Sequence, residues 1–103
     1  MPVKDTSRVA YRELTPQLNR LETQVLKTIY RNSRSCDREI HTRTGLEISS
    51  AVARRNKLSS LGYIRLDGTK KSTTGKTVQA WTITQKGIDY LTLQRQRRLN
   101  QYD

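Results

Sequence analysis

The stretch 44-TGLEISSAVARRNKLSSLGYI-64 decides the fold, because it has the composition of a turn, a helix and the start of a strand. Its apolar side chains are sufficient to anchor it to a hydrophobic core: Leu46, Ile48, Leu58, Leu61 and Ile64. Between them lie short or charged side chains, including serines, alanines, an asparagine and two arginines. Such a helix has one side suited to a core and another side that is short and polar.

Winding residues 48–61 as a helix separates these two sides. At about 100° per residue, Ala51 and Leu58 face the core. The opposite side and its flanks carry Ser49, Ser50, Val52, Ala53, Asn56, Lys57 and Ser60. Because the major groove of DNA is only about 12 Å wide, short side chains let a helix backbone approach the base edges. The outer side therefore suits DNA, although an ordinary solvent-facing helix can have a similar composition.

Individual side chains of this helix suggest contacts with DNA. Hydroxyls and free backbone N–H groups in the first turn, at Ser49 and Ser50, can bind phosphate or a base. Asn56 can pair with adenine, and Arg54 with guanine. The residues that we expect to contact DNA from this helix are Ser49, Ser50, Ala53, Arg54, Asn56 and Lys57.

The charge of the whole chain favours a polyanionic partner. Its 103 residues contain 20 Lys and Arg against 9 Asp and Glu, a net charge of +11, which suits nucleic acid better than an anionic membrane surface. The single cysteine, Cys36, excludes an internal disulfide. No apolar run approaches the ~20 residues of a membrane span, and residues 1–14 lack the hydrophobic block of a secretion signal. We therefore expect one cytoplasmic domain with a modest core.

Two further helices are predicted before the decisive stretch. Thr15 and Pro16 form a suitable capping pair, and the apolar spacing that follows predicts a helix to about residue 31. A short helix is predicted over 37–44, with Ser35 or Cys36 as its cap. Gly45 would end it and supply the left-handed backbone of a tight turn.

The sequence after Gly62 predicts a β-hairpin. The apolar period changes from about 3.6 to about 2 residues, which indicates a half-buried strand containing Ile64 and Leu66. We expect 67–68 (Asp-Gly) to break this strand, 69–76 to be a basic loop, and 78–84 (VQAWTIT) to return as the second strand. Thr84 can then cap a final helix that reaches Leu91 or beyond.

The cations of this hairpin suit phosphate. Lysines on a loop rich in Gly, Thr and Ser are flexible charges that add little sequence readout. The expected DNA contacts are Lys70, Lys71, Thr73 and Lys76. A basic hairpin tip that serves only solubility is the alternative.

The order of these elements is that of a winged helix-turn-helix, an α+β fold with a three-helix bundle, a two-stranded wing and a C-terminal helix. Segment 39-EIHTRTGLEISSAVARRNKLSSLGYI-64 resembles MarR-type and small phage-type DNA-binding proteins, and 81-WTITQKG-87 resembles the junction that follows their wing. DTSRVAYREL at 5–14, RRNKL at 54–58 and TTGKTVQAW at 73–81 resemble short phage-encoded winged-helix proteins. The resemblance implies double-stranded DNA binding, with helix 48–61 in the major groove and the wing on the backbone or minor groove.

Some residues depart from the resemblance or invite another function. His41 stands where motifs of this type usually carry a small residue. We expect its side chain to pack against the protein rather than to bind a ligand. Arg55 stands where an aliphatic residue is usual, so its stem should lie on apolar surface and its guanidinium reach solvent, phosphate or an acid. Proteins that bind left-handed Z-DNA also use a winged helix with a tryptophan, and they carry prolines in the wing. Because this wing has no proline, we expect Trp81 to be structural. Cys36 and His41 lack a third catalytic group, so no enzyme, metal or cofactor site is expected.

The sequence thus predicts a sequence-specific double-stranded DNA-binding transcriptional regulator that represses by occlusion. Residues 1–14 form an arm, 15–91 the DNA-binding domain, and 92–103 a basic helical extension. A homodimer would form through the arm and the final helix, which carries Ile88, Leu91 and Leu99. The alternatives are an architectural or accessory DNA-binding protein in phage recombination or replication, and a winged-helix protein-interaction module. No membrane partner or small-molecule ligand is indicated.

Overall fold

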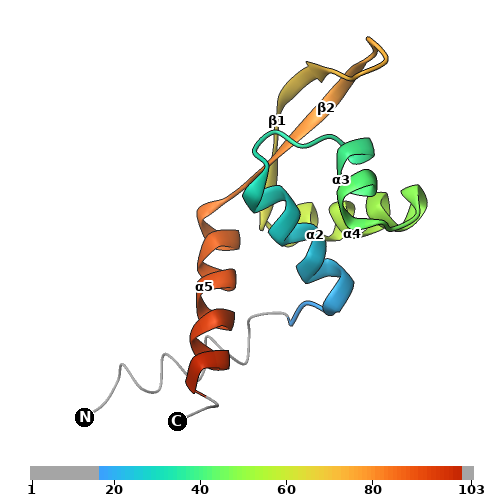
Figure 1. Cartoon of the computed structure of the whole chain (residues 1–103). Helices are drawn as coiled ribbons and strands as arrows, with labels where there is room; N and C mark the ends of the chain where they lie inside the picture. Colours follow the sequence, from blue (N-terminus) through green and yellow to red (C-terminus); the bar gives the residue numbers. More distant parts are fainter. Residues whose placement is uncertain (1–16, 101–103) are drawn as a thin grey trace.

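The computed structural model describes residues 17–100, whose order of elements is helix, helix, helix, strand, strand, helix (Figure 1). The two strands form one antiparallel sheet. This is the predicted α+β winged-helix architecture. The expected arm at 1–14 and the expected cap at Thr15 and Pro16 lie outside the described residues.

Helix α2 spans Arg20–Arg31, so it ends where the sequence predicts but begins later than Pro16. Residues 17–19 are not helical. Asn19 Oδ1 accepts a hydrogen bond from the Glu22 amide at 2.8 Å, and Glu22 Oε1 accepts one from the Asn19 amide at 2.9 Å. This reciprocal capping box satisfies the free N–H groups at the helix start, which explains why the helix begins there.

Helices α3 (Asp37–Thr44) and α4 (Ile48–Ser60) form the predicted helix-turn-helix. Cys36 is the N-cap of α3, and its amide donates to Glu39 Oε1 at 3.0 Å. Gly45 ends α3 with a φ of +76°, and its N–H donates to the His41 carbonyl at 3.0 Å. The turn at Gly45 therefore has the left-handed backbone that the sequence predicts.

The hydrophobic core lies where these three helices meet the base of the sheet. Its fully buried aliphatic members are Val25, Leu26, Ile29, Ile40, Ala51 and Leu58. Two tyrosines extend this core toward the last helix, because the rings of Tyr63 and Tyr90 lie 5.2 Å apart. The Tyr90 hydroxyl also accepts a hydrogen bond from the Leu18 amide at 3.0 Å.

The wing consists of β1 (Ile64–Lys71) and β2 (Thr77–Ile83), and it differs from the prediction in two respects. First, 67–68 do not end the first strand. The register shifts between Leu66 and Thr69, and Gly68 has a φ of +71°, so this segment is a β-bulge within a longer strand. The loop is correspondingly shorter than expected, and Lys70 and Lys71 belong to β1.

Second, the expected burial along the first strand is wrong at Leu66. This side chain is 47% exposed, whereas Tyr63, one residue before the strand, is 1% exposed. The helices cover the base of the wing at Ile64 and leave the outer part of β1 open, as Figure 1 shows.

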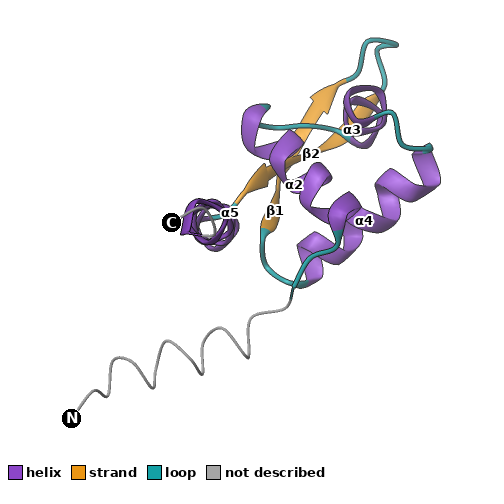
Figure 2. Ribbon diagram, turned by 60° about the horizontal axis from the view of Figure 1, so that its bottom comes forward, coloured by secondary structure: helices purple, strands orange, loops and turns teal. Residues whose placement is uncertain are grey.

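The final helix, α5 (Gln85–Asn100), begins after Thr84, whose hydroxyl accepts a hydrogen bond from the Gly87 amide at 3.2 Å. This confirms Thr84 as the cap. In Figure 2, α5 lies on one side of the sheet's base, and α3 and α4 lie on the other. No helix in the part of the chain that the structure describes is long and apolar enough to cross a membrane.

Candidate nucleic-acid interface

The outer side of α4 is open to solvent, as its helical spacing predicts. Ser49, Ala53 and Asn56 are exposed, whereas Ala51 and Leu58 on the opposite side are fully buried. The centre of the outer surface thus carries side chains no longer than asparagine, with the longer Lys57 on its flank. Residues 49–56 on this surface span about two turns of the helix.

The beginning of α4 is chemically different from that of α2 and α3. Its N-cap residue, Glu47, makes no side-chain capping hydrogen bond, and its first turn carries no acidic residue. The N–H groups of residues 48–50 therefore have neither intrahelical carbonyls nor a side-chain cap. Together with the helix dipole, they favour an anionic partner at this end of the helix.

The flank of α4 nearest α2 holds two cations beside one carboxylate. Lys57 Nζ lies 3.0 Å from Glu22 Oε2, and the Glu22 side chain is only 3% exposed. Burial alone would raise the pKa of Glu22, but hydrogen bonds from Asn19 and Lys57 and the charge of Arg54 bring it below its ordinary value. Arg54 is half-buried, and its Nε is buried without a hydrogen-bond partner. Arg54 and Lys57, which are both expected to contact DNA, thus lie beside the Glu22 carboxylate.

The flank of α4 nearest the wing is organised by Arg55, which is 8% exposed. Its Nε and Nη2 donate to the two carboxylate oxygens of Asp37 at 2.7 and 2.9 Å. Its guanidinium carbon lies 4.4 Å from the ring centroid of Trp81, a cation–π contact. Its Nη1 donates to Asn56 Oδ1 at 2.6 Å. The expectation that Arg55 reaches an acid is confirmed, and Trp81 is 7% exposed within the core.

His41 holds the turn between α3 and α4. Its Nδ1 forms a hydrogen bond with the Leu46 carbonyl, which requires the proton to be on Nδ1. The ring is half-buried, consistent with the expected packing role. Among the residues that the structure describes, no group of three or more His, Cys, Asp and Glu side chains is arranged to hold a metal ion.

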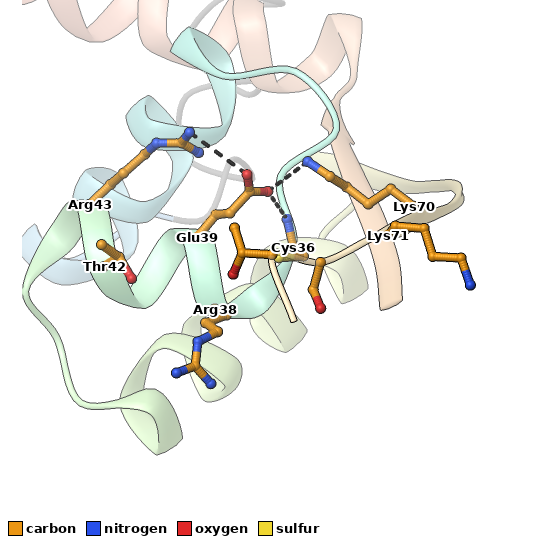
Figure 3. A pocket seen from close by; sticks show the side chains of 9 residues that line it. Cys36, Arg38, Glu39, Thr42, Arg43, Lys70 and Lys71 are labelled. Carbon is orange, nitrogen blue, oxygen red and sulfur yellow. Dashed lines mark hydrogen bonds and ion pairs between the residues drawn. The ribbon is translucent and has the colours of Figure 1, made fainter. Parts of the chain in front are cut away.

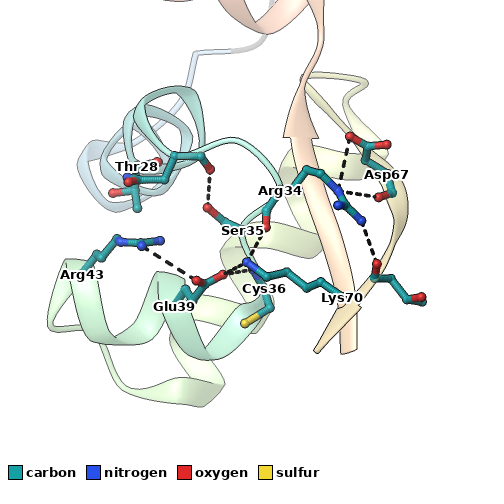
Figure 4. Close-up of polar contacts among 10 residues, drawn as sticks. Thr28, Arg34, Ser35, Cys36, Glu39, Arg43, Asp67 and Lys70 are labelled. Atoms are coloured by element: carbon teal, nitrogen blue, oxygen red, sulfur yellow. Dashed lines mark hydrogen bonds and ion pairs between the residues drawn. The ribbon is translucent and has the colours of Figure 1, made fainter. Parts of the chain in front are cut away.

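The wing is fastened to the loop between α2 and α3 (Figure 4). Arg34 Nη2 donates to the Thr69 carbonyl at 2.7 Å. In return, Lys70 Nζ donates to the Arg34 carbonyl at 3.0 Å and to Glu39 Oε1 at 2.8 Å. Lys70 is therefore half-buried and paired, which corrects the expectation of a flexible loop cation. These contacts fix the direction in which the wing projects from the helices.

The remaining wing residues gather at its tip. Lys71, Thr73 and Lys76 are all exposed. The tip itself is ordered by backbone hydrogen bonds, because the Ser72 amide donates to the Lys76 carbonyl at 2.8 Å and the Gly75 amide donates to the Ser72 carbonyl at 2.9 Å. The structure therefore places three of the four predicted wing residues at the exposed tip, whereas Lys70 is half-buried and paired with Glu39 although it lines the same groove as Lys71 and Thr73.

A groove of about 490 Å³ lies between α4 and the wing. Its lining includes Ile48 and Val52 from α4, Lys76 and Val78 from the wing, and Arg38 from α3. A second groove of about 360 Å³ is also lined by Arg38, together with Lys70 and Lys71. Figure 3 shows Arg38 pointing away from the Glu39 network. Arg38 is an exposed cation that borders both grooves, and it is not among the DNA contacts predicted from the sequence. The sequence signal for this exposure is that Arg38 lies two residues before Ile40, which is buried. Residues two apart lie on nearly opposite sides of a helix.

No family model and no curated protein matches the sequence, but solved structures match the fold. A crystal structure of MarR has a TM-score of 0.68 at 14% identity, over 97% of this chain and 77% of that one. FabT of Streptococcus pneumoniae in complex with DNA has a TM-score of 0.64 at 14% identity, over 96% and 70%. PadR of Bacillus subtilis in complex with operator DNA has a TM-score of 0.61 at 18% identity, over 74% and 46%. The chain therefore has the winged helix-turn-helix fold of MarR-like proteins.

Proposed function

We propose that this chain is a transcriptional regulator that binds double-stranded DNA by inserting α4 into the major groove. The observation that carries the proposal is the short, exposed outer side of α4, which adjoins the lysine-bearing wing across one groove. Short side chains let the backbone of a helix approach the base edges, and the flanking cations can then contact the phosphates. The DNA complexes of the similarly folded FabT and PadR support the same reading.

The proposed contacts divide into two groups. Ser49, Ser50, Ala53 and Asn56 face the bases or the nearest phosphate, with Arg54 and Lys57 on the α2 flank. Lys71, Thr73 and Lys76 at the wing tip, joined by Arg38, contact the backbone. Lys70 acts on the wing's direction through Glu39, 2.8 Å away, rather than as a freely moving cation.

We further propose that the chain represses by occlusion as a homodimer. Figure 1 shows α5 extending away from the helix-turn-helix, and Leu93 on it is 37% exposed. An exposed apolar side chain on a projecting helix can pack against a second copy, and a two-fold dimer would bind half-sites about 10 bp apart or a multiple of that spacing. Sedimentation at equilibrium tests this directly, because a monomer mass at micromolar concentration would contradict it.

The DNA-binding proposal is tested by titrating a labelled duplex at several salt concentrations. A protein that neutralises about six phosphates gives a log–log slope of affinity against salt near −5. Lys71→Ala and Lys76→Ala should each reduce the steepness of that slope by about one and weaken binding to all sequences alike.

Lys27→Ala is the matched control, because Lys27 lines a separate groove between α2 and Gln94 of α5. This variant should bind as the wild type does. Salt-independent binding, or an equal effect of the wing and control variants, would refute the proposed interface and favour a protein-docking role.

A further inference from the structure

The side chain of Asn56 is held in one orientation by its neighbour. Arg55 Nη1 donates to Asn56 Oδ1 at 2.6 Å. A guanidinium carries only donors, so the atom of the Asn56 amide that faces Arg55 must be the oxygen. The assignment of oxygen and nitrogen within this amide thus follows from chemistry. The nitrogen, Nδ2, carries both hydrogens and forms no hydrogen bond within the described residues.

Arg55 is itself fixed from several sides. Asp37 accepts two parallel hydrogen bonds from it, at 2.7 and 2.9 Å, and Trp81 lies 4.4 Å beneath its guanidinium. Arg55 is 8% exposed, and it cannot turn away without breaking both hydrogen bonds to Asp37 and the contact with Trp81. The network therefore runs from the first turn of α3 through α4 to the base of the wing, and Asn56 is its solvent-exposed end.

We propose that Arg55 is a positioning residue that makes Asn56 a donor-only reader, so that Asn56 selects guanine in the major groove and not adenine. This inference rests on the proposed function. Adenine requires a donor and an acceptor from asparagine, because its major-groove edge presents N7 as acceptor and the N6 amino group as donor. Arg55 occupies one of the two lone pairs of the Asn56 oxygen and holds that oxygen 2.6 Å from a guanidinium that is 8% exposed, so the oxygen is turned toward the protein and is poorly placed to accept from a base. Guanine presents two adjacent acceptors, O6 and N7, which match an amide that offers only hydrogens.

This inference revises the sequence expectation for the same residue. Asparagine considered alone favours adenine, since both atoms of its amide are then available. The contact with Arg55 turns the oxygen of this amide toward the protein and leaves the nitrogen as the atom placed for recognition. Specificity at this position is thus set by a residue that does not itself face the DNA.

The test is selection of bound duplexes from a random pool by the wild type and by variants of the exposed Asn56. Asn56→Ala should lose the preference at one base pair, and the wild type should prefer G·C there by about five- to tenfold, the lower part of the range for a base contact. Asn56→Asp keeps an acceptor for Arg55 but faces the DNA with a carboxylate, so it should lose the guanine and prefer a cytosine amino group.

Two further measurements separate positioning from general stability. Replacing that guanine by 7-deazaguanine removes only the N7 acceptor and should weaken the wild type several-fold without affecting Asn56→Ala. Arg55→Lys keeps the charge but cannot hold Asp37 and Asn56 together, so it should let adenine compete at this one position while preferences elsewhere persist. Circular dichroism verifies that each variant is folded.

Ser60→Ala is the control, because Ser60 is exposed on the same side of α4 and its hydroxyl donates to the Lys57 carbonyl at 2.8 Å. Its selected sequences should match those of the wild type. An A·T pair at the Asn56-dependent position, or a consensus unchanged by Asn56→Ala, would overturn the inference and leave DNA binding intact. A pool without any enriched sequence would overturn sequence-specific binding and this inference together.

Discussion

Replacing Asp37 should destabilise the fold more than replacing its partner Arg55. Asp37→Ala leaves a guanidinium that is 8% exposed without its carboxylate. Breaking a buried ion pair in this way costs about 3–5 kcal/mol. The Asp37 side chain is 31% exposed, so water already screens part of the interaction, and about 2–3 kcal/mol is expected.

Arg55→Met should cost less, about 1–1.5 kcal/mol, because it removes the buried charge and returns Asp37 to water. The methionine retains most of the buried stem and can still contact the Trp81 ring, so the main losses are the charged hydrogen bonds and the cation–π contact. The double variant should be no less stable than Asp37→Ala alone, since no unpaired buried charge remains.

Urea unfolding measures these differences in the free energy of unfolding. Fluorescence of Trp81, the only tryptophan, and far-ultraviolet circular dichroism provide two independent signals. Asp89→Ala is a matched exposed control and should change stability by less than about 0.5 kcal/mol. Two results would contradict a buried ion pair. Either Arg55→Met would lower the free energy of unfolding as much as Asp37→Ala, or the loss in the double variant would equal the sum of the two single losses.

Three other changes give separate expectations. Gly87→Ala should destabilise by about 1–3 kcal/mol in thermal melts, because the added Cβ would overlap the Tyr63 carbonyl and approach Ile83 Cγ1 to 2.7 Å; a melting temperature equal to that of the wild type would contradict this packing. Burial would raise the pKa of Glu39, but hydrogen bonds from Lys70 and the Cys36 amide bring it below its ordinary value. The ionised carboxylate therefore stabilises the fold above the ordinary pKa, and this stabilisation is lost as the pH falls through the lower pKa of the folded state. The wild type should therefore lose more stability than Glu39→Gln in urea melts between about pH 5 and pH 3, and parallel losses would contradict the Lys70 pairing. Glu47→Gln should tighten DNA binding at low salt because it removes an exposed negative charge at the start of α4, at a stability cost below about 1 kcal/mol; unchanged affinity would mean that this end does not approach phosphate.

Local chemistry made much of the fold predictable. The spacing of apolar residues places Ala51 and Leu58 inward on a helix whatever the rest of the chain does. Gly45 ends α3 because a left-handed residue is required there, and Thr84 caps α5 because its hydroxyl can reach its own helix's amides. Each of these depends on residues within a few positions, so the sequence alone could reveal them.

Long-range pairing was not predictable in this way. Nothing near Lys70 indicates that it meets Glu39, which is 31 residues away, and Arg55 finds Asp37 at a separation of 18. The alternation around Leu66 is that of a half-buried strand, but only the packed helices determine how far along the wing that burial extends.

By itself, the sequence determined the order of the elements, the inward side of each helix and the basic character of the chain, because periodicity, turn residues and charge are properties of neighbouring residues. Only the tertiary structure decided which cations remain available and which are paired, and that Asn56 presents its nitrogen rather than its oxygen. Those outcomes depend on which carboxylates and guanidinium groups the folded chain brings within hydrogen-bonding distance, and no local pattern encodes that distance.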